Sequence, residues 1–123
     1  MVVRSFAQTD GISYQAVIID PNPKEIPGVD IQGNILPNAT VAIRFTILDQ
    51  NNAEEYQEMQ ITQTDAYGMI NLIIGQGEPT GAGLTEFTLI DWDGTSRSLR
   101  VEVDFDGAGS SFVDLNRMEL TFV

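Results

Sequence analysis

The stretch Val41-Ala-Ile-Arg-Phe-Thr-Ile47 decides the fold, because apolar and polar side chains alternate along most of its length. Its odd-numbered positions carry Val, Ile, Phe and Ile, whereas Arg44 and Thr46 lie between them. Successive Cβ atoms of a β-strand point to opposite faces of a sheet. A period of two therefore predicts a strand with Phe45 on an apolar core face and Arg44 on a polar, water-facing side.

A second stretch shows the same alternation with equal clarity. Its apolar and polar members are Leu99, Val101, Val103 and Phe105, set between Ser98, Arg100, Glu102 and Asp104. Five weaker patterns predict further strands: residues 14–20, residues 55–64 through Met59 and Ile61, residues 69–75, residues 85–92, and a last strand through Met118, Leu120 and Phe122. No helix-length stretch shows apolar residues at helical spacing.

Turn residues separate these runs. Asp65-Ala-Tyr-Gly68 is typical of a tight turn in which Gly68 takes a positive φ. Residues 75–83 hold four glycines and a proline, which predicts a loop. Residues 21–38 hold four of the five prolines, and we expect a long connection there.

Together these patterns predict an all-β fold, a single two-sheet antiparallel β-sandwich, Ig-like or prealbumin-like, of about seven strands. The sandwich is expected over residues 11–123, with a long connection at 21–38, and residues 1–10 are expected to form an N-terminal arm.

Composition excludes several classes of function. The chain has 123 residues, 18 acidic and 6 basic, and a net charge of −12, which argues against nucleic acid as a partner. No apolar run approaches the roughly 18 residues of a membrane helix, so we expect no membrane insertion. Cysteine and histidine are absent, which removes thiol nucleophiles, disulfides, His-based triads and the usual zinc ligands. We therefore expect no enzymatic activity, no cofactor and no metal.

Two acidic turns, Asp91–Gly94 and Asp104–Gly107, have the start of a calcium-loop pattern. Counted from Asp104, the twelfth position is Leu115, which has no oxygen ligand in its side chain; counted from Asp91, the sixth position is Ser96 where glycine is needed. We interpret both as turns that end strands, because Asp and Gly favour turns for backbone reasons.

The aromatic residues allow two interpretations. Trp92 could stack on a sugar ring, but a single Trp in a sandwich more often packs against the core or a sheet edge. Tyr14 and Tyr67 are predicted to anchor their strands through buried rings.

Apolar residues outside the strand pattern are the candidate subunit contacts. A small sandwich has limited room to bury them, and exposed apolar patches usually mark interfaces. The N-terminal arm could instead be a frayed end. The candidates are Val2, Val3, Phe6, Ile26, Val29, Ile31, Ile35 and Leu36.

Four stretches in order carry a resemblance: Gly11-Ile-Ser-Tyr-Gln-Ala-Val17; Tyr56-Gln-Glu58; Thr64-Asp-Ala-Tyr-Gly68 followed by Asn71-Leu-Ile-Ile-Gly-Gln-Gly77; and Ile90-Asp-Trp92 followed by Leu99-Arg-Val-Glu-Val-Asp104. They resemble the β-sandwich domain of bacteroidete secreted, surface and tail-fibre-like proteins and of structural proteins of their phages. The resemblance covers residues 11 to 122 and implies no catalytic residues. The turn at Thr64 is also similar to prealbumin-like and carboxypeptidase-regulatory-type sandwiches.

Two functions follow as expectations. The first is a structural protein that contacts other protein subunits and is oligomeric in an assembly, as a phage virion component: a head-decoration, auxiliary capsid or fibre protein. The second is a secreted or cell-surface adhesin module that binds glycans or host protein. Both place the protein in a virion or outside the cell. The N-terminal residues are too short and too weakly apolar for a signal peptide. A removed signal, release by lysis and excision from a longer chain all remain open.

Overall fold

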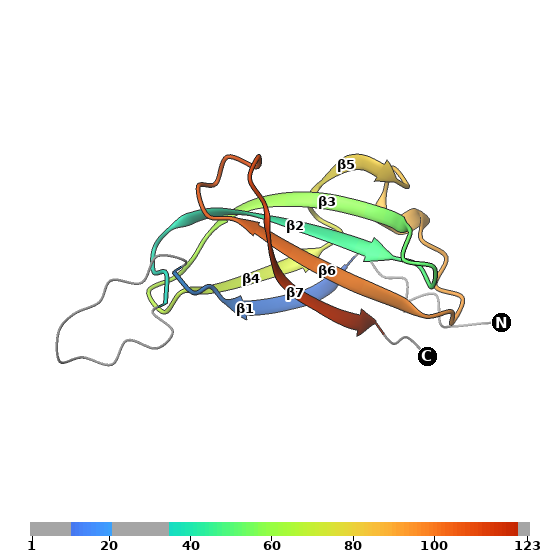
Figure 1. The fold of residues 1–123 in the computed structure, drawn as a ribbon, viewed down its shortest axis with the longest axis horizontal. Coiled ribbons are helices and arrows are strands. Elements are labelled where there is room, and N and C mark those ends of the chain that lie inside the picture. Colours follow the sequence, from blue (N-terminus) through green and yellow to red (C-terminus); the bar gives the residue numbers. More distant parts are fainter. Residues whose placement is uncertain (1–10, 21–34, 121–123) are drawn as a thin grey trace.

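The computed structural model describes residues 11–20 and 35–120, and these form an all-β fold of two antiparallel sheets (Figure 1). The predicted fold class is confirmed. The strands are β1 (Ile12–Val17), β2 (Thr40–Leu48), β3 (Glu54–Gln63), β4 (Met69–Ile74), β5 (Glu78–Gly83), β6 (Arg97–Asp104) and β7 (Val113–Leu120).

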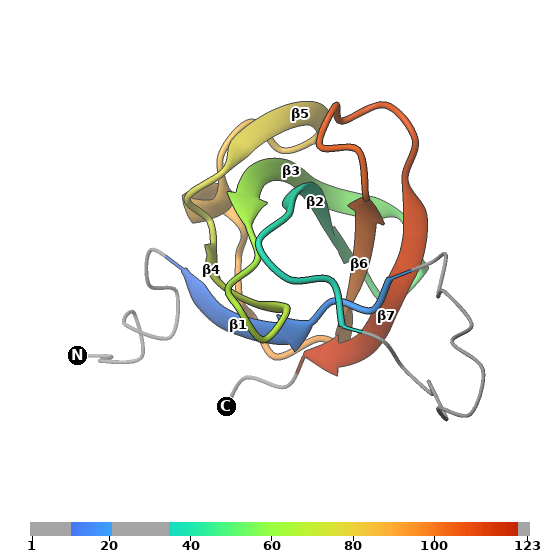
Figure 2. The same ribbon diagram turned by 90° about the vertical axis from the view of Figure 1, so that its left-hand side faces the viewer.

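The two sheets differ in width. The large sheet has the order β5-β3-β2-β6-β7, so β2 lies at its centre, and the small sheet is the pair β1-β4. Figure 2 shows β1 and β4 across from β2 and β3, with the interior of the molecule between them. β2 is central because it pairs with β3 along one edge and with β6 along the other. Its apolar residues line the interior, as expected for the core face of an antiparallel sheet.

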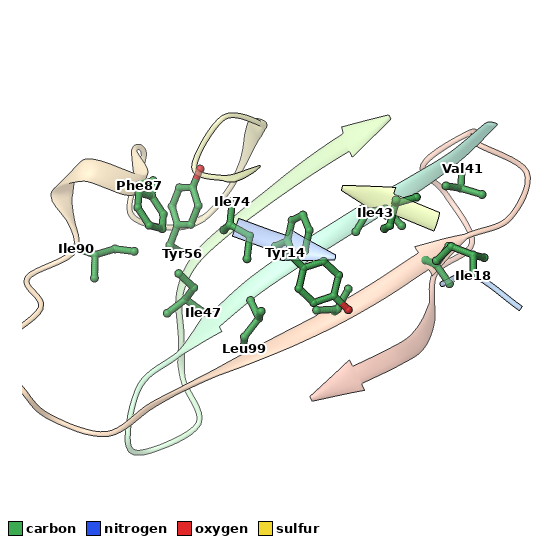
Figure 3. Packing of buried hydrophobic residues seen from close by; sticks show 14 of the residues in the cluster. Tyr14, Ile18, Val41, Ile43, Ile47, Tyr56, Ile74, Phe87, Ile90 and Leu99 are labelled. Carbon is green, nitrogen blue, oxygen red and sulfur yellow. The ribbon is translucent and has the colours of Figure 1, made fainter. Parts of the chain in front are cut away.

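The core lies between the sheets and is centred on Phe45. In the ladders this residue is opposite Glu58 of β3 and Val101 of β6, and it is fully buried. Tyr14 of β1 meets it edge-on, with ring centroids 5.3 Å apart and planes at 75°. Figure 3 shows side chains from both sheets converging on this interior, among them Tyr14, Ile43 and Leu99.

The other face of β2 is partly covered, whereas the sequence predicted that it faces water. Thr46 on that face has no exposed surface, and Arg44 makes a two-pronged ion pair with Glu102 at 2.9 and 2.8 Å. The connection from β6 to β7 folds over this face, as Figure 1 shows. It places the Phe112 ring 4.2 Å from the Arg44 guanidinium carbon and Gly109 against Met59.

One strand was predicted in the wrong place, and another was not predicted. Residues 85–92, predicted as a strand, contain a single 3-10 turn at Phe87–Leu89, whereas the glycine-rich stretch predicted as a loop contains β5. This strand pairs with β3 only at Glu58–Pro79 and Met59–Glu78, which explains why it lacks an apolar pattern. The last strand begins at Val113, earlier than predicted, and Phe122 lies outside the described residues.

In β3, the alternation through Met59 and Ile61 does not mark the core face. Tyr56 and Glu58 point into the sandwich and are 1% and 0% exposed, whereas Ile61 on the opposite face is 59% exposed. A buried glutamate at a core-facing position explains the wrong interpretation, because an acidic residue in such a pattern normally indicates the solvent side.

We predict that Phe45→Ala lowers the free energy of unfolding by about 3–5 kcal/mol, because it removes a fully buried ring and leaves a cavity. The matched control is Ile61→Ala on the exposed face of β3, which should cost less than about 1 kcal/mol. Urea unfolding of both variants measures the difference. Equal losses would contradict the register of β2 against β3.

Candidate functional site

The most unusual polar group of the described residues is the Glu58 carboxylate, which is 0% exposed inside the sandwich. It accepts four hydrogen bonds: from Tyr56 Oη at 2.7 Å, Gln60 Nε2 at 2.7 Å, and the backbone N–H groups of Gly75 and Gly77 at 2.8 and 3.2 Å. The two glycines lie in the turn between β4 and β5. One side chain of the large sheet therefore holds the end of the small sheet.

Local sequence explains how this cluster forms. Tyr56, Glu58 and Gln60 lie at alternate positions of β3 and share one face, so their side chains reach the same point. Position 77 requires glycine, because a Cβ there would lie 2.6 Å from Gln60 Cγ and 2.7 Å from the Met59 carbonyl oxygen. Gln60 also donates to the Ile73 carbonyl at 2.8 Å, which adds a second link to β4.

The chemistry of the Glu58 cluster is suited to a structural role. All four partners of Glu58 are donors, so they match a deprotonated carboxylate, which only accepts. Burial raises the pKa of the Tyr56 phenol, and its hydrogen bond to Glu58 and the nearby negative charge raise it further. The Tyr56 hydroxyl and the Glu58 carboxylate are hydrogen-bonded to each other. Glu58 has no oxygen without a partner, and the phenol is not readily ionised, so neither group is available for proton transfer with a ligand.

A second polar cluster surrounds Arg97, which is 7% exposed. Its guanidinium pairs with Glu55 at 2.6 and 3.2 Å, donates to the Asp91 carbonyl at 2.6 Å, and lies 5.1 Å from the Trp92 ring centroid. The hydrogen bond with Glu55 raises the pKa of Arg97. Trp92 is 7% exposed and packs on Phe87 at 5.9 Å, which favours the core-packing interpretation over an open sugar platform.

The acidic turns bind their own backbone. Asp104 accepts hydrogen bonds from the N–H groups of Asp106, Ser110 and Ser111 at 2.9 to 3.2 Å; the pKa of its carboxyl is lowered by these bonds, most of all by that from Ser110. Asp93 accepts from the Thr95 N–H at 3.0 Å. These contacts support the interpretation as turns. Among the described residues, no group of three or more acidic side chains is placed to hold a metal ion.

The exposed apolar side chains gather on the small sheet. Of the ten large apolar residues that are exposed in the described chain, six lie on β1, β4 or the segments joined to them. We call these six the outer apolar patch: Val17, Ile19, Ile35, Tyr67, Met69 and Ile73. Val17 is opposite Met69 in the ladder, and Ile19 forms a bridge with Ile35.

The predicted contact residues divide into three groups. Ile35 belongs to the outer apolar patch and is 40% exposed, whereas Leu36 packs against the core. The remaining candidates lie outside the described residues: Val2, Val3, Phe6, Ile26, Val29 and Ile31.

The two tyrosines that were predicted to have buried rings differ. Tyr67 is 75% exposed, so this prediction is wrong for it; Tyr14, at 6%, is buried as predicted.

The sequence did not identify Glu58, although two signals were present. Tyr56-Gln-Glu58 and Gly75-Gln-Gly77 stand among the stretches that carry the resemblance, and the structure brings these two together through the carboxylate. Glu58 on β3 and Gly75 in the turn after β4 are 17 positions apart in the sequence, so their contact could not be predicted from residue spacing alone.

Comparisons with family models, with curated proteins and with solved structures find no match for this chain. The fold and the arrangement of surface groups therefore carry the functional argument. No helix within residues 11–20 and 35–120 is long and apolar enough to cross a membrane.

We predict that Glu58→Gln lowers the free energy of unfolding by about 2–3 kcal/mol. The amide NH2 that replaces one carboxylate oxygen faces the two donors which that oxygen accepted, and the charge that strengthens all four bonds is lost. Glu119→Gln on the exposed side of β7 is the matched control, with an expected change below about 0.5 kcal/mol. Chemical denaturation measures both. A Glu58→Gln protein as stable as the control would contradict the linking role of the carboxylate.

Proposed function

We propose that this domain is a non-enzymatic structural protein that works through contacts with other protein subunits, as a phage virion component of the head-decoration, auxiliary capsid or fibre type. The observation that carries the proposal is the outer apolar patch, in which six large apolar side chains are 39–75% exposed on one small sheet and the segments joined to it. Contiguous exposed apolar surface is characteristic of interaction sites.

The charge of the chain supports the same proposal. A net charge of −12 opposes indiscriminate association of free subunits, so association through an apolar surface depends on a specific fit between subunits. Burial of the patch contributes about 25 cal/mol per Å² before the costs of association are subtracted. Location in a virion or at the cell exterior belongs to this proposal.

The alternative function, an adhesin module, rests on the secreted members of the resembling family and on Trp92, and the structure weakens the second of these supports. Its glycan-binding form rested on Trp92, whose ring is buried against Phe87 and Arg97. Its protein-binding form differs from the proposal in stoichiometry, because an assembly protein occurs in many symmetric copies and an adhesin need not. Cryo-electron microscopy of the native particle or filament separates the two: symmetric copies of this fold support the proposal, and single copies bound to a glycan or host protein contradict it.

We predict that deletion of residues 1–10 leaves the melting curve of the isolated domain nearly unchanged and abolishes incorporation into the assembly. The reason is that the arm is proposed to contact a neighbouring subunit, while the core described above is formed from residues further along the chain. Calorimetry and quantification of incorporated protein measure the two effects. Full incorporation of the truncated protein would show a frayed end, and loss of the fold would show that the arm belongs to the sandwich.

A further inference from the structure

The small sheet has an unpaired edge on β1, which pairs with β4 on one side and with no described strand on the other. Strand edges of this kind accept a further strand unless charge, proline, a bulge or a covering segment protects them. The residues of β1 are Ile-Ser-Tyr-Gln-Ala-Val, which include no charge and no proline, and its ladder with β4 has no register shift.

The other sheet edges near the interior are protected. At the far edge of β4, the Ile73 carbonyl accepts from Gln60 and the following Gly75 N–H donates to Glu58. The edge strand β5 contains Pro79 and two glycines with positive φ. The edge strand β7 carries Asp114, Arg117 and Glu119 and has a register shift against β6.

The direction of the backbone groups on β1 follows from the hydrogen bonds around it. The Ile18 N–H donates to the Gly68 carbonyl, on the β4 side. Backbone groups alternate sides along a strand, so those of Tyr14 and Ala16 also point to β4. The N–H and C=O groups of Ser13, Gln15 and Val17 therefore point to the open edge.

The sandwich is also incompletely covered at this edge. Met118 and Asn116 of β7 lie opposite the core residues Leu99 and Val101 in the ladder, so they share the inward face. Both are nevertheless exposed, Met118 to 37%. Figures 1 and 2 show β7 passing close to β1, on the side away from β4. One more strand on β1 would extend the small sheet toward these two residues.

From this open edge we infer that β1 is the acceptor for the N-terminal segment of a second copy of this chain, residues 2–7, added as a third strand of the small sheet. The inference rests on the proposed function and names the surface that receives the arm. Main-chain hydrogen bonds supply the pairing in strand addition, and side chains on alternate positions supply the fit.

The segment has the chemistry that this place requires. Val2-Val3-Arg4-Ser5-Phe6-Ala7 contains no proline or glycine, and apolar side chains occur on both faces when it is extended. One face of the added strand would meet Met118, and the other would lie beside Val17 in the outer apolar patch. Its only charge is Arg4, which is attracted to a partner with net charge −12.

The first test removes one edge N–H. Gln15→Pro deletes a donor that points to the open edge and leaves the β4 ladder intact, as proline on an edge strand can. We expect self-association of the full chain, measured by sedimentation, to weaken about tenfold, since one such hydrogen bond is worth about that factor. Gln15→Ala keeps the N–H and should associate normally. Ala16→Pro removes a β4-directed donor and should lower the melting temperature, which Gln15→Pro should change far less.

The second test requires no backbone change. The natural chain has no cysteine, so single-cysteine variants form disulfides only where they meet. Gln15→Cys protein is mixed with Arg4→Cys or with Ser5→Cys protein, since side chains alternate and one of the two shares the face of Gln15. Asn51→Cys, exposed in the turn after β2, replaces Gln15→Cys as the control.

A disulfide-linked dimer in the Gln15→Cys mixture, at least about tenfold above the Asn51→Cys control, is the expected result. A double variant carries the Gln15→Cys substitution and the arm cysteine in one chain. Cross-linking only within this chain would show that the arm pairs with its own β1 and would overturn the inference. No cross-link in either format would overturn it as well. If that occurs while deletion of residues 1–10 still abolishes assembly, the proposed function stands and only the acceptor edge is wrong.

Discussion

A buried carboxylate links the two sheets of this protein. A two-stranded sheet is too small to be stable alone, so β1 and β4 depend on packing against the large sheet. Glu58 supplies a directional contact at that junction: it extends from β3 and accepts the N–H groups of Gly75 and Gly77 at the end of β4. A buried charge is costly unless its hydrogen-bonding capacity is filled, and here four donors fill it. The residues around it are thereby constrained, including the glycine at position 77.

The same junction determines which surface remains open. Gln60 and Glu58 bind backbone groups at the outer edge of β4, so among the described residues the edge of the small sheet that is left for a further strand is that of β1. The long β6–β7 connection covers part of the outer face of the large sheet. Asp104 accepts hydrogen bonds from the backbone of this connection, and Phe112 lies over Arg44. Apolar exposure is consequently concentrated on the small sheet, and the surface proposed for subunit contact is a result of how the core is closed.

The sequence predicted the fold where the alternation was complete and failed where burial was polar or pairing was short. The strands β2 and β6 were predicted within two residues at each end, because their core faces are uniformly apolar. The strand β5 was missed because it contributes little to the core and pairs with β3 at only two positions. The faces of β3 were misread because Glu58 is buried, a contact that depends on a turn distant in the sequence.

The candidate surface was predicted in part. The apolar residues outside the strand pattern pointed to subunit contact, and Ile35 does lie in an exposed patch, but most of that patch comes from β1 and β4 themselves. Val17 and Met69 sit in predicted strands, so their exposure could not be inferred before it was known that the small sheet has only two strands and nothing described over its outer face. The width of a sheet is set by long-range pairing, which a period of two does not contain.

Amide hydrogen exchange along β1 distinguishes an open edge from one that is paired with a further strand. In the chain lacking residues 1–10, the N–H groups of Ser13, Gln15 and Val17 should exchange quickly while those of Tyr14 and Ala16 are protected by β4. In the assembled full-length chain, the account predicts that all five are protected. Equal, rapid exchange of Ser13, Gln15 and Val17 in both states would contradict it.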